Sequence, residues 1–354
     1  MKNFPVILRW CLFPLAVLYW LIIEVRNFLY DHHVIRAHKF SVPVISIGNL
    51  TVGGTGKTPF VIFIAQYLLD FPARVGIVSR GYGRKSKGTL VVHDGSSIQS
   101  APDQSGDEAW LMASALKSVP VIVDEHRSRG VRRMVNEFQV DVILLDDAFQ
   151  HRQTARDVNI LLMNSQVPLW HYHLLPVGRL REPLRQSRRA DIIVHTKCPD
   201  HSIPVMARQL ARFTNIPNIC SNFWYQTGQY QNGHFIPADI PRSERIFAFC
   251  GIGDPESFRQ ALTFLDILPA KWEIFPDHQK YPESVVNRLR SHIESDACSV
   301  LITTEKDRVK LPSNFCESFS IYIINIIIKF RDAGDKDLTG LIRQTMDKKK
   351  ESAL

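Results

Sequence analysis

The sequence predicts an α/β protein built on a doubly wound sheet, with a second, smaller α/β domain and an N-terminal membrane helix. Three observations predict this class: an apolar run near the N-terminus, β-branched runs that alternate with helical stretches, and a second set of such runs near the C-terminus. With 354 residues, of which 45% are hydrophobic and 22% charged, the chain can bury one large core or two modest ones.

The formal net charge of +8 suits an anionic partner, which is a nucleic acid, a phosphorylated substrate or an acidic membrane surface. No nucleic-acid-binding module is recognisable, so we expect no nucleic acid partner. The six cysteines are scattered without a CxxC pair, which indicates reduced thiols in a cytosolic setting rather than a disulfide framework or a zinc site.

The apolar run from Phe4 to Ile23 contains Arg9 as its only charged residue. As a helix it would rise roughly 30 Å, about the thickness of the hydrocarbon core of a bilayer. No small-x-small cleavage site follows it, which disfavours a signal peptide. A buried core helix remains an alternative to an anchor that spans the membrane or lies in its interface.

A β-branched strand, 42–48, leads into the glycine-rich loop 49–58 and then into a helical stretch, Pro59 to Leu69. This order of elements is the one that a phosphate-binding P-loop requires. Lys57 would reach the terminal phosphates of a nucleotide and the Thr58 hydroxyl would bind Mg²⁺. The predicted nucleotide-binding residues of the loop are Thr51, Val52, Gly53, Gly54, Thr55, Gly56, Lys57 and Thr58.

Two positions of the loop distinguish it from related ones. The full P-loop pattern has glycine where this chain has Thr51. Membrane-associated partitioning ATPases have a second lysine at the place of Val52, which argues against that class.

A second apolar strand, 140–145, ends in the acidic pair Asp146-Asp147. The carboxyl ends of the strands form the ligand crevice of an open α/β sheet, so the pair is expected beside the magnesium of the P-loop. The alternative is a helix cap or a surface turn.

Asp107 opens a helical stretch, Ala109 to Leu116, and His278 lies in a short polar segment. Taken separately, Asp107 is most simply a helix cap and His278 a surface histidine. As a pair they would form a carboxylate–imidazole dyad able to accept the proton of a hydroxyl group. Arg181-Glu182, in a basic glycine segment, suits phosphate binding or an ordinary surface ion pair.

Taken together, these segments resemble tetraacyldisaccharide 4'-kinase, the lipid A kinase of Gram-negative bacteria. The resemblance runs from the apolar helix to about residue 310 and rests on these segments in the order of the family: Gly48–Pro59, Ser79–Gly83, Gly106–Glu108, Leu145–His151, Leu180–Pro183, Gly251–Pro255, Asp277-His278 and Thr304–Asp307. Ala148 stands where the family usually has glycine, which would make the backbone after the acidic pair less free.

The resemblance implies ATP-dependent phosphorylation of the 4'-hydroxyl of a tetraacylated glucosamine disaccharide 1-phosphate, a step of lipid A biosynthesis. It implies ATP and Mg²⁺ as cofactors and action at the cytoplasmic face of the inner membrane, with no obligatory protein partner. A membrane-associated P-loop switch ATPase without a lipid acceptor is the alternative. The implied roles are general base for Asp107 with His278, metal binding for Thr58, Asp146, Asp147 and Glu182, and phosphate binding for Arg181.

Apolar runs on both sides of Gln231-Asn232-Gly233 predict a β-hairpin, which we expect to connect the two domains. Closure of the domains would then assemble the dyad. Gly251-Ile-Gly253 after a strand is weak evidence for a second nucleotide site. The expected division is an anchor (1–35), a P-loop kinase domain (36–220), the hairpin connector (221–240), the smaller α/β domain (241–345) and a frayed basic tail (346–354).

Overall fold

The structure is a computed structural model that describes residues 6–71, 73–198, 204–231, 234–241 and 243–351. It confirms the predicted α/β class. The helices are α1 Val6–Asp31, α2 Lys57–Leu69, α3 Pro102–Ser105, α4 Asp107–Ala115, α5 Arg127–Phe138, α6 Val205–Leu210, α7 Pro255–Phe264, α8 Glu283–Ser295, α9 Glu305–Arg308, α10 Ser313–Ser318 and α11 Gly334–Glu351, with the 3-10 turns η1 Leu169–His171 and η2 Leu184–Arg189. The strands are β1 Val44–Asn49, β2 Val75–Ser79, β3 Leu90–His93, β4 Val121–Val123, β5 Val142–Asp146, β6 Val158–Asn164, β7 Ile192–Thr196, β8 Asn218–Gln231, β9 His234–Pro237, β10 Ile246–Cys250, β11 Lys271–Ile274, β12 Val300–Thr304 and β13 Ser320–Phe330.

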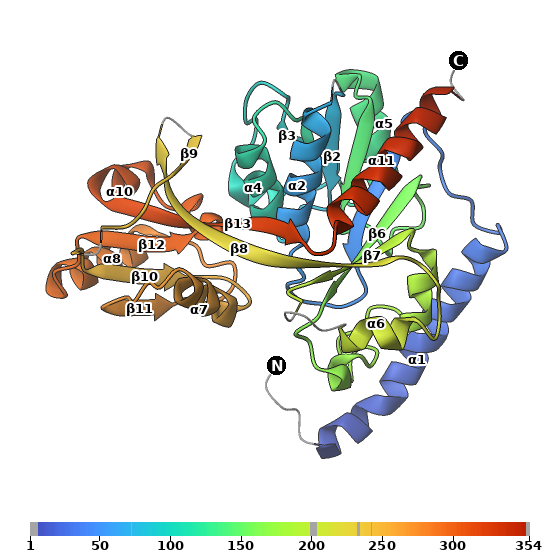
Figure 1. The fold of residues 1–354 in the computed structure, drawn as a ribbon, viewed down its shortest axis with the longest axis horizontal. Coiled ribbons are helices and arrows are strands. Elements are labelled where there is room, and N and C mark those ends of the chain that lie inside the picture. The colour runs from blue at the N-terminus through green and yellow to red at the C-terminus, as the bar shows by residue number, and fades with distance from the viewer. Residues whose placement is uncertain (1–5, 72, 199–203, 232–233, 242, 352–354) are drawn as a thin grey trace.

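The strands form two lobes that share one continuous path of pairing (Figure 1). The large lobe has the order β7-β6-β1-β5-β2-β4-β3, and its neighbouring strands are parallel except at β3. The small lobe has the order β11-β10-β12-β13, all parallel. Parallel strands joined by helices leave the carboxyl ends of β1, β2 and β5 side by side, which is where a ligand crevice forms.

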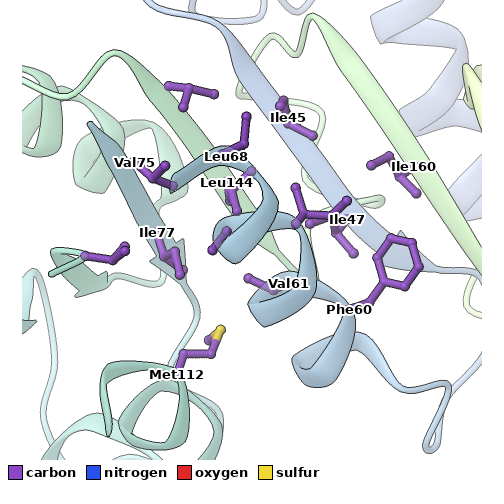
Figure 2. Close-up of a cluster of buried hydrophobic side chains, with 14 of the residues drawn as sticks. Ile45, Ile47, Phe60, Val61, Leu68, Val75, Ile77, Met112, Leu144 and Ile160 are labelled. Carbon is purple, nitrogen blue, oxygen red and sulfur yellow. The ribbon is translucent and has the colours of Figure 1, made fainter. Parts of the chain in front are cut away.

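Both faces of the large sheet are covered, as a doubly wound sheet requires. Ile45 and Leu144 face α2, α4 and α11, whereas their neighbours Val44 and Ile143 face α5 in a separate cluster. Figure 2 shows α2 lying over the first of these faces. This alternation is the period-two pattern of strands buried on both sides, and it fixes the register that aligns the P-loop with the acidic pair.

A two-stranded ribbon of β8 and β13 runs between the lobes (Figure 1). The two strands pair antiparallel from Ile323↔Gly228 to Phe330↔Ser221, and β8 also pairs parallel with β7 of the large lobe. The predicted hairpin is confirmed in that β8 pairs with β9, while its turn, 232–233, lies outside the described residues. That the hairpin connects the two domains stays a prediction. Along the crossing between the lobes, β8 pairs with β13, which is distant in sequence.

The glycines of Gly251-Ile-Gly253 serve packing in the small lobe. A Cβ at Gly251 would lie 2.8 Å from Cβ of Gln279, and one at Gly253 would lie 2.7 Å from Oδ2 of Asp277. Both glycines therefore let the turn after β10 press against the loop that carries His278. This close approach explains the motif without the second nucleotide site that it weakly suggested.

Helix α1 is long and apolar enough to cross a membrane over Cys11–Asp31. Most of its large apolar side chains are exposed, including Leu18, Leu21 and Ile22. The alternative of a buried core helix is therefore wrong. The helix lies along the large lobe at one edge of the molecule (Figure 1), with its polar residues against that lobe.

The C-terminal segment forms the helix α11 rather than a frayed tail. Leu338, Ile342 and Met346 are buried in the same cluster as α2 and the large sheet. Over 346–351 the predicted frayed tail is helical instead, because an amphipathic helix gains apolar burial against the large lobe, while 352–354 lie outside the described residues. The expected domain division stays a prediction. It placed 334–345 in the smaller domain, whereas this segment packs on the large lobe.

We expect Ile342→Ala to lower the free energy of unfolding by about 2–4 kcal/mol, because it removes buried methylene groups and leaves a cavity. Urea unfolding of the full chain in detergent, followed by circular dichroism, measures the change. Gln344→Ala on the exposed face of the same helix is the control and should change it by less than about 0.5 kcal/mol. Equal, negligible effects would mean that α11 is not packed as described.

Candidate active site

The P-loop connects β1 to α2 and has its backbone held in a conformation that favours glycine. Gly56 lies just before α2 with a φ of 81°, and a Cβ on it would lie 2.2 Å from the ring of Phe223 on β8. A side chain at this position is therefore excluded both by backbone strain and by the ribbon between the lobes. The first backbone N–H groups of α2, without partners inside the helix, point into the loop, which makes this end of the helix suitable for a phosphate.

Neighbouring strand ends hold the loop in place. Asn49 Nδ2 donates to Oγ1 of Thr55 at 3.0 Å, and Thr196 Oγ1 donates to the carbonyl oxygen of Thr55 at 3.1 Å. Thr51 and Val52 pair with the chain at 179–180, and Val52 N donates to Arg179 O at 2.8 Å. Beyond them, Asn164 Nδ2 donates to the carbonyl oxygen of Gly54 at 3.3 Å, and Arg179 Nη1 lies beside Gly53. Thr51, at the expected glycine position, is therefore accommodated by strand-like pairing rather than by a turn.

Asp147 lies between two cations of the site. Arg181 Nη1 contacts its two carboxylate oxygens at 2.9 and 3.0 Å, and Lys57 Nζ lies 3.7 Å from Oδ1. Burial alone would raise the pKa of Asp147, but Lys57 and Arg181 outweigh it and lower this pKa. The backbone of the turn has its left-handed residue at Asp147, with a φ of 46°, so Ala148 needs no glycine-like freedom.

Asp146 is buried at the end of β5, and Ser79 Oγ donates to its Oδ2 at 2.7 Å. Its Oδ1 is buried without a hydrogen-bond partner among the described residues. Burial, with the negative charges of Glu108 and Asp147, raises the pKa of Asp146 to about 6. A buried carboxylate with an unpartnered oxygen and acidic neighbours is an arrangement that a bound cation stabilises.

These residues fit Mg²⁺. The described residues contain no group of three His, Cys, Asp or Glu side chains able to hold a metal ion. Mg²⁺ does not need one, because it takes one or two carboxylates and completes its shell with substrate phosphates and water. The free Oδ1 of Asp146, the neighbouring Asp147 and the Thr58 hydroxyl at the start of α2 meet that requirement.

Glu182 lies in a different environment from the acidic pair. Its carboxylate is completely buried and pairs with Arg26 of α1 through one oxygen and with Arg189 of η2 through the other. The metal-binding role expected for Glu182 stays a prediction, and this structure engages both of its oxygens with guanidinium groups. The preceding residue, Arg181, contacts Asp147 instead, so adjacent side chains contact the phosphate-loop region and helix α1.

The predicted dyad is assembled across the two lobes. His278 Nδ1, from the small lobe, lies 3.0 Å from Oδ2 of Asp107, the first residue of α4 in the large lobe. The Tyr82 ring stands 5.8 Å from the His278 ring, between centroids. The expectation that closure of the domains assembles this pair stays a prediction; in this structure the two side chains are in contact.

The segment after β2 links the dyad to the acidic pair. Ser79 at its start bonds Asp146, and Tyr82 three residues later contacts His278. Gly106, with a φ of 87°, lets the chain before Asp107 approach this segment, because a Cβ there would lie 2.7 Å from the Tyr82 carbonyl oxygen. The dyad and the proposed metal site are therefore two ends of one connected cluster.

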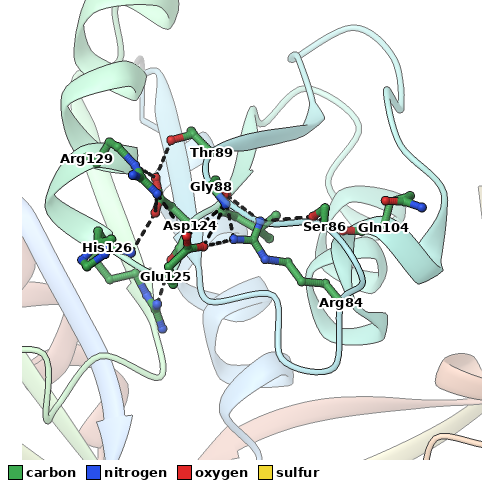
Figure 3. Close-up of polar contacts among 11 residues, drawn as sticks. Arg84, Ser86, Gly88, Thr89, Gln104, Asp124, Glu125, His126 and Arg129 are labelled. Carbon is green, nitrogen blue, oxygen red and sulfur yellow. Dashed lines mark hydrogen bonds and ion pairs between the residues drawn. The ribbon is translucent and has the colours of Figure 1, made fainter.

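Sequence reasoning missed Arg127, a fully buried arginine at the start of α5. Its Nη1 donates to the Asp124 carbonyl oxygen at 2.9 Å, while Nε and Nη2 have no partner among the described residues. Burial lowers the pKa of Arg127 to about 10, so its guanidinium stays charged at neutral pH. Figure 3 shows the ion pairs of Asp124 and Glu125 that fix the turn before α5.

Arg127 lies among other charged side chains of the site. Arg80 and the acidic pair are close enough to influence its charge. Burial and the nearby arginines, Arg127 and Arg80 foremost, lower the pKa of His151 to about 3, so that imidazole is neutral. Nothing in the sequence around Arg127 marks it as functional, because its role depends on burial beside strands distant in sequence.

The chain matches the family model described as Tetraacyldisaccharide-1-P 4'-kinase over residues 8–346. It is 39% identical over 311 residues to a tetraacyldisaccharide 4'-kinase of Chlorobium luteolum, covering 84% of this chain and 85% of that protein. A tetraacyldisaccharide 4'-kinase of Aquifex aeolicus is 39% identical over 306 residues, covering 86% of this chain and 90% of that protein.

A crystal structure of LpxK from Aquifex aeolicus, described as an apo form in complex with ATP, has the same fold. It superposes with a TM-score of 0.79 and 36% sequence identity, covering 96% of this chain and 99% of that one. The sequence matches and the shared fold agree over nearly the whole chain, and this protein belongs to the tetraacyldisaccharide 4'-kinase family.

Proposed function

We propose that this kinase transfers the γ-phosphoryl group of ATP to the 4'-hydroxyl of a tetraacylated glucosamine disaccharide 1-phosphate, with Asp107 as the general base. The observation that carries the proposal is the hydrogen bond between Asp107 and His278, at 3.0 Å, in a cluster that continues to the P-loop carboxylates. A carboxylate and an imidazole in contact form a proton acceptor whose position and charge are fixed. A switch ATPase without an acceptor would need no such pair.

In the proposed step, Asp107 takes the proton of the 4'-hydroxyl as that oxygen bonds to the γ-phosphorus. The bond from this phosphorus to the bridging oxygen breaks, and ADP leaves. Transfers of this kind depend on alignment and charge neutralisation more than on covalent catalysis. His278 holds Asp107 in position and stabilises the proton on the dyad.

The phosphates of ATP are bound by the P-loop backbone, Lys57 and Arg181. Thr58, Asp146 and Asp147 would hold Mg²⁺, which would neutralise charge on the phosphate oxygens. In this structure Lys57 and Arg181 both contact Asp147. Binding of ATP would give both cations a phosphate partner in addition to this carboxylate.

The exposed apolar face of α1 is proposed to lie in the cytoplasmic face of the bacterial inner membrane. Leu18, Leu21 and Ile22 on α1 each expose about half of their surface. Apolar side chains exposed in this way along one helix are typical of an interfacial or membrane-inserted helix. Between α1 and the chain at 172–184 lies an apolar groove of about 610 Å³, which suits acyl chains of the acceptor. The absence of nucleic acid and of an obligatory protein partner stays an expectation.

We expect Asp107→Ala to lower kcat by about 10²–10⁴-fold, because the proton of the hydroxyl loses its acceptor. Transfer of label from γ-labelled ATP to the lipid disaccharide in detergent micelles measures it. Asp103→Ala is the control, since this carboxylate lies on the surface and pairs with Lys85. Rapid ATP hydrolysis without any labelled lipid from the folded wild type would favour the switch ATPase instead.

Replacing Leu21 and Ile22 together by serine should weaken binding to vesicles of anionic lipid by at least about a hundredfold, because two apolar side chains of about 1.5–3 kcal/mol each are lost from the contact. Flotation of the full chain with such vesicles measures the partition. The matched control replaces Leu268 and Ile274 by serine, two exposed apolar residues of the small lobe. Equal flotation of both variants and wild type would argue against α1 as the membrane contact.

A further inference from the structure

Lys310 follows α9 in the small lobe and reaches across to the large lobe. Its Nζ lies 3.5 Å from Oδ2 of Asp107 and 3.5 Å from Oδ1 of Asp307. The Lys310 side chain is only 8% exposed, so this ammonium group is removed from water and held between two carboxylates. A buried lysine is retained at a site only where its charge is matched, and here one of the matching charges is the proposed base.

Asp307 holds the ammonium group of Lys310 in position. Its carboxylate is completely buried and is held by three donors: Gly251 N at 2.9 Å, Tyr281 Oη at 3.0 Å and Thr304 Oγ1 at 2.6 Å. The backbone N–H of Lys310 also bonds the Asp307 carbonyl oxygen at 3.0 Å. Because Asp307 has no freedom to move, the ammonium group of Lys310 is aimed at Asp107.

Two donors of the small lobe converge on one oxygen of Asp107. His278 Nδ1 and Lys310 Nζ both contact Oδ2, and no hydrogen bond to Oδ1 occurs within the described residues. The second oxygen is therefore the one left for the hydroxyl of the acceptor. A carboxylate that is contacted by two donors on one oxygen has a fixed orientation as well as a charge, and a general base requires both.

We propose that Lys310 is a positioning residue of the reaction, which holds Asp107 ionised and turns its Oδ1 toward the acceptor by gripping Oδ2 from the opposite lobe. The proposal rests on the proposed role of Asp107 as general base. It goes beyond the dyad because it makes the base a three-part assembly of Asp107, His278 and Lys310. The small lobe supplies two of the three residues, His278 and Lys310, so the separation of the lobes controls the state of the base.

The charged groups around Asp107 come from several segments. They are His278 and Asp277 from the loop after β11, Lys306 from α9, Lys310 and Asp307 beside them, and Glu108 on α4 itself. Burial would raise the pKa of Asp107, but the His278 hydrogen bond and the charge of Lys310 lead the effects that lower it. Removal of Lys310 therefore raises this pKa, so the base is protonated at a higher pH and activity is lost first on the acid side.

The experiment compares Lys310→Met, Lys310→Arg and Asp107→Asn in the full chain, with ATP and the lipid disaccharide in detergent micelles. We expect Lys310→Met to lower kcat at least about tenfold and to move the acid limb of the kcat profile up by about one pH unit. KM for ATP should stay within about twofold. Lys310→Arg keeps the charge and should restore the acid limb and part of kcat.

A double-mutant cycle separates positioning from a structural role. In the Asp107→Asn background, Lys310→Met should add less than about a twofold loss, because both changes act on the same carboxylate. Lys271→Met, which removes a surface lysine paired with Asp296 in the same lobe, is the control and should leave kcat and its pH profile unchanged. Thermal unfolding of each variant is measured alongside.

The outcomes are distinguishable. Full activity of Asp107→Asn would overturn the base assignment itself, and the proposal for Lys310 with it. An inactive Asp107→Asn combined with an unshifted acid limb in Lys310→Met would overturn the Lys310 proposal alone. Multiplicative losses in the cycle with a lowered melting temperature would do the same, since they would assign Lys310 to the stability of the small lobe through Asp307.

Discussion

The hydrogen bond between Asp107 and His278 is the interaction on which the rest of the active site depends. It joins a helix start in the large lobe to a loop in the small lobe, so every element that sets the separation of the lobes also sets this distance. The β8–β13 ribbon does so directly, because its strands pair with one another along the crossing and β8 continues into the large sheet. A ribbon with a continuous hydrogen-bond ladder resists slippage by one residue, which would turn its side chains to the opposite face.

Charge is the second constraint. Carboxylates crowd the carboxyl ends of β2 and β5, and burial there makes like charges costly. The site balances them with cations from distant parts of the chain: Lys57 and Arg181 at Asp147, and Lys310 at Asp107. Asp146 is the exception, since its Oδ1 has no partner among the described residues and its pKa is raised. That imbalance favours a cation beside Asp146, as the proposed Mg²⁺ site requires.

The sequence was sufficient to predict the strands that carry the P-loop and the acidic pair, because fully buried strands and glycine loops have strong local signatures. The pairing of Asp107 with His278 was predictable only from the family resemblance, since 171 positions separate the two residues. Arg127 and Lys310 were not predictable. Their significance comes from burial and from carboxylates that approach in the folded chain, and neither leaves a pattern in local sequence. The sequence analysis did not predict that α11 is an ordered helix, because the segment contains many charged residues and only three large apolar side chains that become buried.

Helix α1 is fixed to the catalytic lobe at the segment that also serves the P-loop. Tyr19 of α1 donates to the Arg181 carbonyl oxygen at 2.8 Å, and Arg26 pairs with the neighbouring Glu182. On its other side, Arg181 N donates to Leu50 O at 2.7 Å, and its guanidinium contacts Asp147. A short segment is thus packed between the helix and the phosphate loop. Any surface that receives the apolar face of α1 therefore meets the P-loop in one orientation, since no flexible linker intervenes between this segment and either of them.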